Sequence, residues 1–259
     1  MAFYFDQLGR KIQLDEPPKK IISLVPSLTE LLFDLGLDEH IAGRTKFCIH
    51  PQGKVEKVTS IGGVMGFKYH KIEEIQPDLI LASKEENAKN EILELDKQFP
   101  VWVSDVHNLT DALEMISSIG KMCNKEEKAK KLTKNIENNF RELDDIPAGV
   151  IRGIYLIWKN PYYTINRNTF IHDMLKRCGV ENVFASKEDD YPIIKEKEIK
   201  EKNPDYIFLP SEPYNFKEKD LEEFRKKFPG KEIKRVDGEY FSWYGSHLLK
   251  APTYFKQIF

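Results

Sequence analysis

The pattern of apolar and polar positions occurs twice along the chain. Residues 72–81 and 198–209 each combine a short amphipathic stretch with Pro-Asp and a run of apolar residues. Proline cannot continue a helix and biases the residue before it towards an extended conformation, and a short apolar run is typical of a buried strand. Upstream, residues 36–41 and 179–183 share a second pattern that begins with glycine, the expected cap of a helix. The repeat predicts two similar α/β lobes.

The remaining pattern predicts helices that alternate with short strands, which favours mostly parallel sheets. A capping box, Ser27 to Glu30, predicts the start of the first helix. Strands are expected at 21–25, 101–103, 153–158, 205–209 and 232–236. Helices are expected from the capping box to residue 35, and at 87–99, 109–123, 168–177, 217–228 and 246–259. Residues 46–68 are expected to be an irregular loop, and loops of that length are usually functional or mobile.

One further amphipathic helix is expected at 125–144. Twenty helical residues span about 30 Å, and this segment lies between the two repeats. We interpret it as an inter-lobe strut, with an ordinary surface helix of one lobe as the alternative. The expected organisation is an N-terminal lobe at 1–123, the connecting helix within 124–148 and a C-terminal lobe at 149–259, with a ligand cleft between the lobes. The apolar positions of the expected helix at 125–144 are Ala129, Leu132, Ile136, Phe140 and Leu143.

Composition excludes several classes of function. The formal net charge is −2, which gives no electrostatic basis for binding nucleic acid. No apolar run reaches the roughly 18–20 residues of a membrane span. The first residues have neither the basic region nor the apolar stretch of a signal peptide. We therefore expect a cytoplasmic monomer, with a periplasmic protein or lipoprotein as the alternative if a leader has been removed.

Catalytic and metal-binding motifs are missing from the sequence. The three cysteines are widely spaced and form no C-x-x-C pair; we expect Cys123 and Cys178 to be packed in the core and Cys48, in a loop, to be more accessible. No Walker A, G-x-G-x-x-G, H-E-x-x-H or G-x-S-x-G motif occurs. His50, with His107 and His247, could ligate the metal of a bound cofactor or could be an ordinary surface histidine. The sequence favours a binding protein with no intrinsic cofactor over an enzyme.

Aromatic residues gather where the predicted strands end. Open α/β sheets bind ligands at the carboxyl ends of their strands. Trp158 ends one expected strand of the second lobe, and Trp243 follows another. Each ring contact could add about 0.5–1.5 kcal/mol to binding; the alternative is that these rings fill the core below the loops. Trp102, inside a strand, is expected in the core. The predicted ligand-binding residues are Pro26, Ser27, Phe47, His50, Gly62, Gly63, Glu86, Trp158, Tyr162, Trp243 and Tyr244.

Several segments together resemble one family, from about residue 6 to the end. Residues 20–30, the Pro-Asp strands, residues 85–87 and the long helix are similar to the helical-backbone metal-chelate receptors, the binding proteins of ABC importers for cobalamin, haem and ferric siderophores. Residues 47–51 and 237–244 look most like the cobalamin-binding branch. The resemblance implies two lobes bridged by one helix, a rather rigid cleft, and capture of a corrinoid without catalysis. Haem or a ferric siderophore is the alternative ligand, and a cytoplasmic corrinoid-handling accessory protein or enzyme is the alternative class.

The sequence departs from the resemblance at the surface that would meet a permease. Importer-type members carry a glutamate on each lobe for docking, and the matching positions here hold His70 and Lys197. Glu196 and Glu198 lie beside the second position, and Glu73 and Glu74 follow the first. The resemblance therefore implies weak docking to an ABC permease of the usual type.

Overall fold

The computed structural model describes residues 2–147 and 149–258, which form two compact units. Unit 1 comprises the chain up to Val106, Thr110–Ile136 and Tyr244–His247. Unit 2 comprises His107–Leu109, Glu137–Trp243 and the chain from Leu248 onward. Each unit contains its own parallel sheet, so the two-lobe α/β class expected from the repeat is confirmed.

Unit 1 is built on a four-stranded parallel sheet in the order β4-β3-β5-β6. Its central strands are buried on both faces, as sheets covered by helices require. A separate antiparallel hairpin pairs β1 with β2. The strands are β1 Ala2–Phe5, β2 Lys11–Leu14, β3 Ile21–Ser23, β4 Ile41–Arg44, β5 Leu79–Ser83 and β6 Val101–Ser104. The helices are α1 Pro26–Asp34, α2 Tyr69–Ile75, α3 Lys89–Leu95 and α4 Leu109–Met122, with single turns η1 Asp38–His40 and η2 Val55–Lys57.

Unit 2 repeats this plan with a parallel sheet in the order β9-β7-β11-β12. A small antiparallel pair joins β8 to β10. The strands are β7 Ile151–Tyr155, β8 Tyr162–Tyr163, β9 Val180–Asn182, β10 Ile193–Ile194, β11 Tyr206–Pro210 and β12 Glu232–Val236. The helices are α6 Phe170–Arg177, α7 Glu196–Lys202, α8 Glu218–Lys227, α9 Glu239–Ser242 and α10 Ala251–Ile258, with the single turn η3 Ser246–Leu249.

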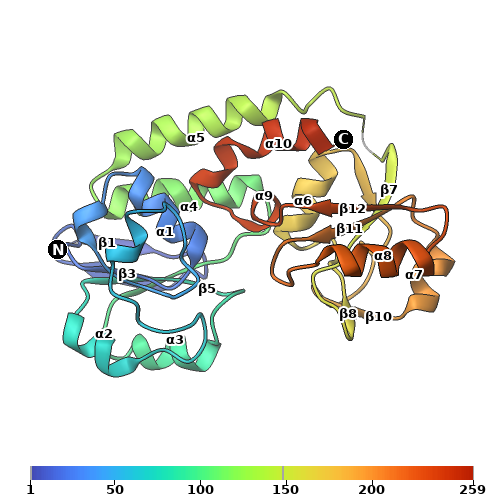
Figure 1. Ribbon diagram of the computed structural model, residues 1–259. Coiled ribbons are helices and arrows are strands. Elements are labelled where there is room, and N and C mark those ends of the chain that lie inside the picture. The colour runs from blue at the N-terminus through green and yellow to red at the C-terminus, as the bar shows by residue number, and fades with distance from the viewer. Residues whose placement is uncertain (1, 148, 259) are drawn as a thin grey trace. The chain divides into compact units, whose positions relative to one another are not determined.

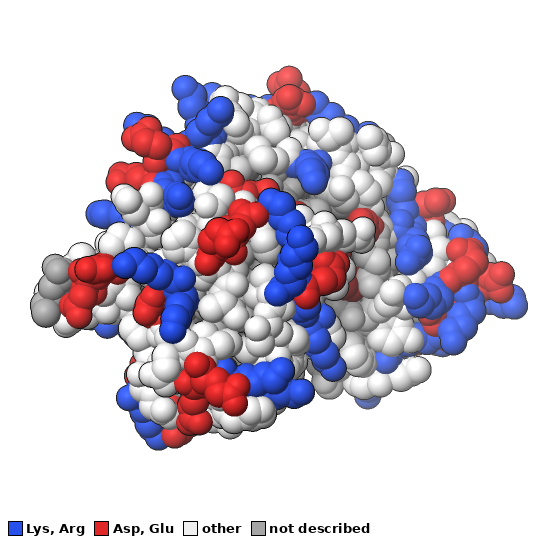
Figure 2. Space-filling view, turned by 60° about the vertical axis from the view of Figure 1, so that its left-hand side comes forward, with Lys and Arg blue, Asp and Glu red and all other residues white. Residues whose placement is uncertain are grey.

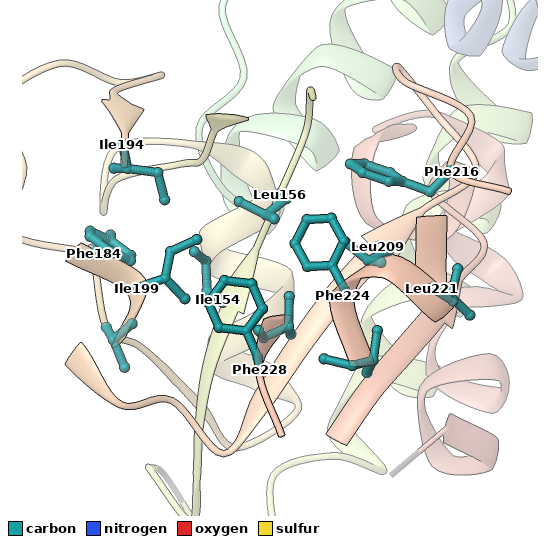
Figure 3. Packing of buried hydrophobic residues seen from close by; sticks show 13 residues of the cluster. Ile154, Leu156, Phe184, Ile194, Ile199, Leu209, Phe216, Leu221, Phe224 and Phe228 are labelled. Atoms are coloured by element: carbon teal, nitrogen blue, oxygen red, sulfur yellow. The ribbon is translucent and has the colours of Figure 1, made fainter. Parts of the chain in front are cut away.

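The core of unit 2 lies between this sheet and helix α8. Figure 3 shows Phe224 of α8, and Phe228 directly after that helix, among apolar side chains of β7 and β11. The rings of Phe216 and Phe224 meet edge to face with centroids 6.2 Å apart, a favoured aromatic geometry. Burying each such side chain contributes about 1.5–3 kcal/mol. This packing holds the strand ends that carry the candidate site.

The repeat seen in the sequence is a repeat of structure. In both sheets the first strand lies between the second and the third, and the fourth follows the third. Helices α2 and α7 both end on a left-handed residue, Gln76 and Asn203, immediately before the Pro-Asp pair. Strands β5 and β11 then follow as predicted. The same local signals therefore produce the same element order in each unit.

The amphipathic segment between the repeats forms one continuous helix, α5 Glu126–Arg141 (Figure 1). Its buried positions include Ala129, Ile136 and Phe140, in agreement with the expected spacing. The helix is shorter than the predicted 125–144 because turns follow Arg141. The division between the units falls within it, after Ile136. Its role as a strut and the predicted domain boundaries stay predictions.

Two details of the predicted elements are wrong. Ser27 does not cap the first helix, because α1 already begins at Pro26, with Val25 as its N-cap. Proline at the first position needs no hydrogen bond for its nitrogen and has a backbone angle suited to a helix. The C-terminal helix is also not continuous: it divides into η3 and α10, and Pro252 lies in the first turn of α10. Residue 259, the end of that prediction, lies outside the described residues.

The surface carries charges of both signs. On the face shown in Figure 2, basic and acidic side chains alternate over short distances rather than separating into large regions of one sign. The sequence contains 40 Lys and Arg against 42 Asp and Glu, which agrees with this mixture. Among the described residues, no helix is both long and apolar enough to cross a lipid bilayer.

Candidate ligand-binding site

In each sheet the second strand lies on one side of the first strand and the third strand lies on the other. The strand order therefore reverses between the first and the third strands. These pairs are β3 and β5 in unit 1, and β7 and β11 in unit 2. Ligands of open α/β sheets bind beyond the carboxyl ends of the strands at such a point. The loops that follow these four strands therefore supply the candidate ligand-binding residues of each unit.

In unit 1 the loop after β3 leads directly into helix α1. Pro26 is half-buried, and Ser27 is buried with a hydroxyl that has no hydrogen-bond partner among the described residues. Gly245 packs on this turn so closely that a Cβ atom there would lie 2.6 Å from the Ser27 carbonyl oxygen. Segment 244–247 can therefore reach the start of α1 only because residue 245 is glycine.

The loop after β5 brings two predicted residues, Glu86 and Tyr244, together. Asn87 accepts a hydrogen bond from the Ser83 backbone N–H at 2.9 Å, which closes a tight turn. The Tyr244 hydroxyl donates to Ser83 Oγ at 2.8 Å and lies 3.3 Å from a carboxylate oxygen of Glu86. Burial, and then the charge of Glu86, raises the pKa of Tyr244, so the phenol is a neutral donor.

A histidine and a glutamate lie near the other end of segment 244–247. His247 is buried, and its Nδ1 lies 3.1 Å from Oε2 of Glu30 on helix α1. The ring of the predicted residue His50 is 6.4 Å from that of His247, centroid to centroid. His107, the third histidine considered, belongs to unit 2, where its ring contacts the Asn168 carbonyl oxygen at 2.6 Å.

The irregular loop 46–68 carries Phe47, Gly62 and Gly63. The Phe47 ring is 50% exposed, and the Lys46 ammonium lies 5.0 Å from its centroid. Gly62 has a φ of 116°, and a Cβ atom on Gly63 would lie 2.7 Å from the Met65 carbonyl oxygen. Both glycines are thus required by the shape of the loop itself, whatever part they have in binding.

Cys48 is not accessible, contrary to the expectation from its place in a loop. It is 2% exposed, and its Sγ lies 3.0 Å from Thr29 Oγ1 and 3.3 Å from Thr45 Oγ1. Burial raises the pKa of the thiol. Loop 46–68 packs against helix α1 through the contact between Cys48 and Thr29. The sequence pattern of the loop did not indicate this contact. Cys123 and Cys178 are buried free thiols, as expected.

In unit 2 the segment after β7 presents an indole ring. Trp158 is 44% exposed and pairs across a β-bridge with Tyr163. Its ring stands edge-on to Tyr214, with centroids 5.3 Å apart and an angle of 68° between the planes. Tyr214 lies in the loop after β11, so the loops at the switch point of this sheet meet through two aromatic side chains.

The residue after Trp158 is anchored in an ion-pair network. Lys159 Nζ lies 2.7 Å from Asp220 and 2.6 Å from Glu223, both on helix α8. Burial alone would lower the pKa of Lys159, but the hydrogen bonds that its ammonium donates to the two carboxylates raise the pKa. Lys227 of the same helix donates to the hydroxyl of Tyr162 at 3.0 Å. Helix α8 thus fixes both ends of the turn that carries the predicted residues Trp158 and Tyr162.

Trp243 lies deeper than the sequence prediction implied. It is 5% exposed, while the neighbouring Tyr240 is half-buried and stacks on Tyr254 with centroids 4.2 Å apart. The indole Nε1 of Trp243 donates to Oε1 of Glu212 at 2.6 Å. Glu212 lies in the loop after β11. Trp102 is fully buried in β6, as expected.

The predicted residues therefore divide between the units. Within unit 1 the structure joins Glu86 to Tyr244 and places Phe47 against Gly63. Sequence reasoning missed Glu30, Ser83, Glu212 and Tyr214, which support predicted residues through side-chain contacts. Glu212 and Tyr214 could have been found from their place after β11, since that loop lies at the switch point. The site residues of unit 2 are Trp158, Tyr162 and Trp243; the others belong to unit 1.

Two other features bear on ligand chemistry. Within residues 2–147 and 149–258, no three His, Cys, Asp or Glu side chains are placed to hold a metal ion. An open hollow of about 550 Å³ beside the β8–β10 pair is lined by Tyr163 and charged residues at 187–189. It contains none of the predicted site residues, so it is not part of the candidate site.

The positions expected to meet a permease are equivalent in the two units. His70 is the second residue of α2, and Lys197 is the second residue of α7. Both are exposed, and Lys197 Nζ lies 3.6 Å from Glu201. Glu196 and Glu198 pair with Lys200 and Lys187, whose hydrogen bonds lower the pKa values of the two carboxyls.

Comparison with known proteins finds relatives over most of the chain. Residues 21–231 match the family described as periplasmic binding protein. The vitamin B12-binding protein of Vibrio parahaemolyticus is 27% identical over 200 residues, covering 75% of this chain and 71% of that protein. An uncharacterised ABC transporter substrate-binding lipoprotein of Bacillus subtilis is 26% identical over 214 residues, covering 78% and 67%. The petrobactin-binding protein of Bacillus subtilis shares the fold, with a TM-score of 0.81 over 99% of this chain and 97% of that one, at 18% identity.

Proposed function

The chain belongs to the periplasmic binding protein family, and on that basis we propose that it captures a corrinoid, a cobalamin-like metal chelate, for an ABC transporter. A relative named for vitamin B12 binding, similar over three quarters of the chain, supports this ligand. The proposed ligand contacts are the predicted residues in the loops after the strands of the two sheets. The location of the ligand between the lobes stays a prediction of the sequence.

The observation that carries the proposal is the exposed indole of Trp158 at the switch point of the unit 2 sheet. The indole ring is 44% exposed and packs beside the ring of Tyr214, and paired aromatic side chains of this kind are common in the lining of small-molecule sites. Tyr214 supports the ring from one edge, and Lys159 fixes the backbone beside it. A flat, partly apolar macrocycle with polar side groups is the kind of ligand that such a ring would contact.

Two alternatives are retained. The shared fold with a petrobactin-binding protein supports keeping haem or a ferric siderophore as the alternative ligand, because the fold by itself does not select the chelate. The contrasting class is an enzyme or corrinoid-handling accessory protein. The relatives named above are binding proteins, which favours the non-catalytic role.

Titration of the purified protein with four chelates tests the proposal. Cyanocobalamin, cobinamide, haemin and a ferric siderophore would be added separately, with absorbance spectra and calorimetry as readouts. We expect cyanocobalamin or cobinamide to bind with a dissociation constant of about 1 µM or below, equivalent to about −8 kcal/mol. Selective binding of haemin or the siderophore would replace the ligand assignment, and no binding of any chelate would refute the proposed function.

The transport partner and the location form part of the proposal. The family description and the lipoprotein among the relatives favour the periplasmic or lipoprotein location over the cytoplasmic one. Lys197 and His70 at the docking positions favour weak association with a permease, because a lysine carries the opposite charge to the docking glutamate that the resemblance implies. Tight association with a cobalamin permease complex that is lost in Glu196→Ala or Glu198→Ala would show that neighbouring glutamates perform the docking instead.

A further inference from the structure

Glu212 makes contacts that its place in a loop did not suggest. Its Oε1 accepts two hydrogen bonds, from the indole Nε1 of Trp243 at 2.6 Å and from Ser242 Oγ at 2.8 Å. Trp243 and Ser242 follow β12, whereas Glu212 follows β11. One carboxylate oxygen therefore ties together the ends of two neighbouring strands of the unit 2 sheet. Hydrogen bonds to an ionised acceptor are about twice as strong as neutral ones.

The backbone around Glu212 is shaped to keep this arrangement. A Cβ atom on Gly238 would lie 2.6 Å from the Glu212 carbonyl oxygen and 2.8 Å from its Cγ, so position 238 admits only glycine. The preceding residue, Ser211, accepts a hydrogen bond from the Gly238 backbone N–H at 2.9 Å and donates to Asp237 at 3.2 Å. The two loops are thus joined by backbone packing as well as by the carboxylate.

Stability alone does not account for a carboxyl group at this place. Burial raises the pKa of Glu212, and the negative charges of Glu239 and Asp237 raise it further. Among the described residues, no Lys, Arg or His forms an ion pair with Glu212, whose carboxylate accepts hydrogen bonds from Ser242 and Trp243. A buried charge without a counter-charge is costly, and such groups are concentrated at functional sites.

We propose that Glu212 is a positioning residue of the ligand-binding site: it fixes the largely buried indole ring of Trp243, a residue that is 5% exposed, so that the exposed part of that residue faces the chelate. This inference rests on the proposed function. Glu212 acts through Trp243: the carboxylate selects one rotamer of the ring, so that the ordering of a large side chain is complete before the ligand binds. Preorganisation of this kind increases affinity by removing an entropic cost from the binding step.

Four variants test the positioning role through affinity. Glu212→Ala removes the acceptor, Glu212→Gln keeps an oxygen at the same place, and Trp243→Phe removes the indole N–H while keeping an aromatic ring. We expect Glu212→Ala to weaken binding of cyanocobalamin about tenfold or more, the loss expected for one strong hydrogen bond. Glu212→Gln should restore most of the affinity, and in the Trp243→Phe background Glu212→Ala should have no further effect. The control is Glu222→Ala, which removes an exposed carboxylate from helix α8 of the same unit.

A spectroscopic readout separates this inference from the proposed function. In protein labelled with ¹⁵N at its three tryptophans, Trp243→Phe identifies the indole resonance of Trp243 without any ligand. We expect that proton to lie downfield, to move in Glu212→Ala and to titrate with the Glu212 carboxyl in the unmodified protein. If no chelate binds, the proposed function fails while the NMR result still decides whether Glu212 fixes the ring.

Two outcomes would overturn the positioning role. One is a folded Glu212→Ala variant with unchanged affinity for the chelate. The other is an indole resonance that stays constant from about pH 4 to about pH 9, the range that includes raised carboxyl pKa values. The second measurement uses the unmodified protein, so it remains decisive if Glu212→Ala fails to fold.

Discussion

Asp78 and Asp205 perform the same task in the two sheets. The backbone N–H of Asp78 donates to the Lys20 carbonyl oxygen at 2.9 Å, and that of Asp205 donates to the Arg152 carbonyl oxygen at 2.8 Å. Each carboxylate also accepts from the backbone at the start of the neighbouring first strand. The Pro-Asp pair thus joins the third strand of each sheet to the first.

The two aspartates should differ in their contribution to stability. Asp78 accepts from the backbone N–H groups of Lys19 and Lys20 at 2.8 and 3.0 Å, whereas Asp205 accepts from Arg152 at 3.4 Å. We expect Asp78→Ala to lower the free energy of unfolding by about 1–2 kcal/mol and Asp205→Ala by about half as much. Urea denaturation measures both, and an equal cost for the two variants would contradict the difference in geometry.

Lys159 should be important for the stability of unit 2. Its side chain is 10% exposed and that of Asp220 is 2% exposed, so removing the ammonium leaves a buried carboxylate unpaired. Lys159→Met should cost about 3 kcal/mol or more in the free energy of unfolding. The matched control is Lys256→Met, which breaks the exposed pair with Glu142 and should cost about 1 kcal/mol or less. Similar losses in the two variants would show that burial of the Lys159 pair adds nothing.

Trp158 offers a direct test of the candidate site. Trp158→Ala should weaken chelate binding about tenfold or more, since aromatic anchors contribute about 2 kcal/mol or more at binding sites. Because the ring is 44% exposed, the melting temperature should change little. Ile193→Ala removes another exposed apolar side chain of unit 2 and serves as the control. Calorimetry that finds unchanged affinity in Trp158→Ala would remove this residue from the site.

The stability of the protein should depend on pH through Glu212. Its pKa is raised in the folded state by burial, so the fold binds this proton more tightly than the unfolded chain does. The contribution of Glu212 to stability is therefore complete below its ordinary pKa and is lost as the pH rises through the raised value. Glu212→Gln, which has no charge to bury, should gain stability relative to the unmodified protein as the pH rises through that window.

The pH dependence of stability should have the opposite sign at Glu198. The Lys187 hydrogen bond lowers the pKa of Glu198, so its contribution is present above the ordinary carboxyl pKa and is lost as the pH falls through the lowered value. Glu198→Gln should therefore be less stable than the unmodified protein at neutral pH, with the difference closing in acid. Denaturation of both variants across pH checks the signs; parallel curves for the two would contradict the assigned causes.

The cysteines should be unreactive in the folded protein. Burial raises the pKa values of all three thiols, that of Cys123 to about 12. Since the thiolate is the reactive form, a thiol reagent at mildly alkaline pH should modify the native protein only slowly and modify three groups per chain after unfolding. Rapid modification of Cys48 in the native state would mean that loop 46–68 opens readily.

The sequence determined the repeat, the two-lobe class and the order of most elements, because these follow from local signals. Proline after each short helix and an apolar run after each Pro-Asp act within a few residues of chain. The error at the first helix has the same local origin. Both Pro26 and Ser27 are typical of a helix start, and the helix begins at Pro26.

Only the tertiary structure decided which side chains support the site. Tyr244 and Ser83 are 161 positions apart, and Trp243 and Glu212 are 31 apart, so no periodicity connects them. A pattern of apolar and polar residues indicates which face of an element is buried but not what covers it. For this reason the sequence did not predict that Cys48 is buried within its loop. It also did not predict that the indole N–H of Trp243 donates to a carboxylate instead of to solvent.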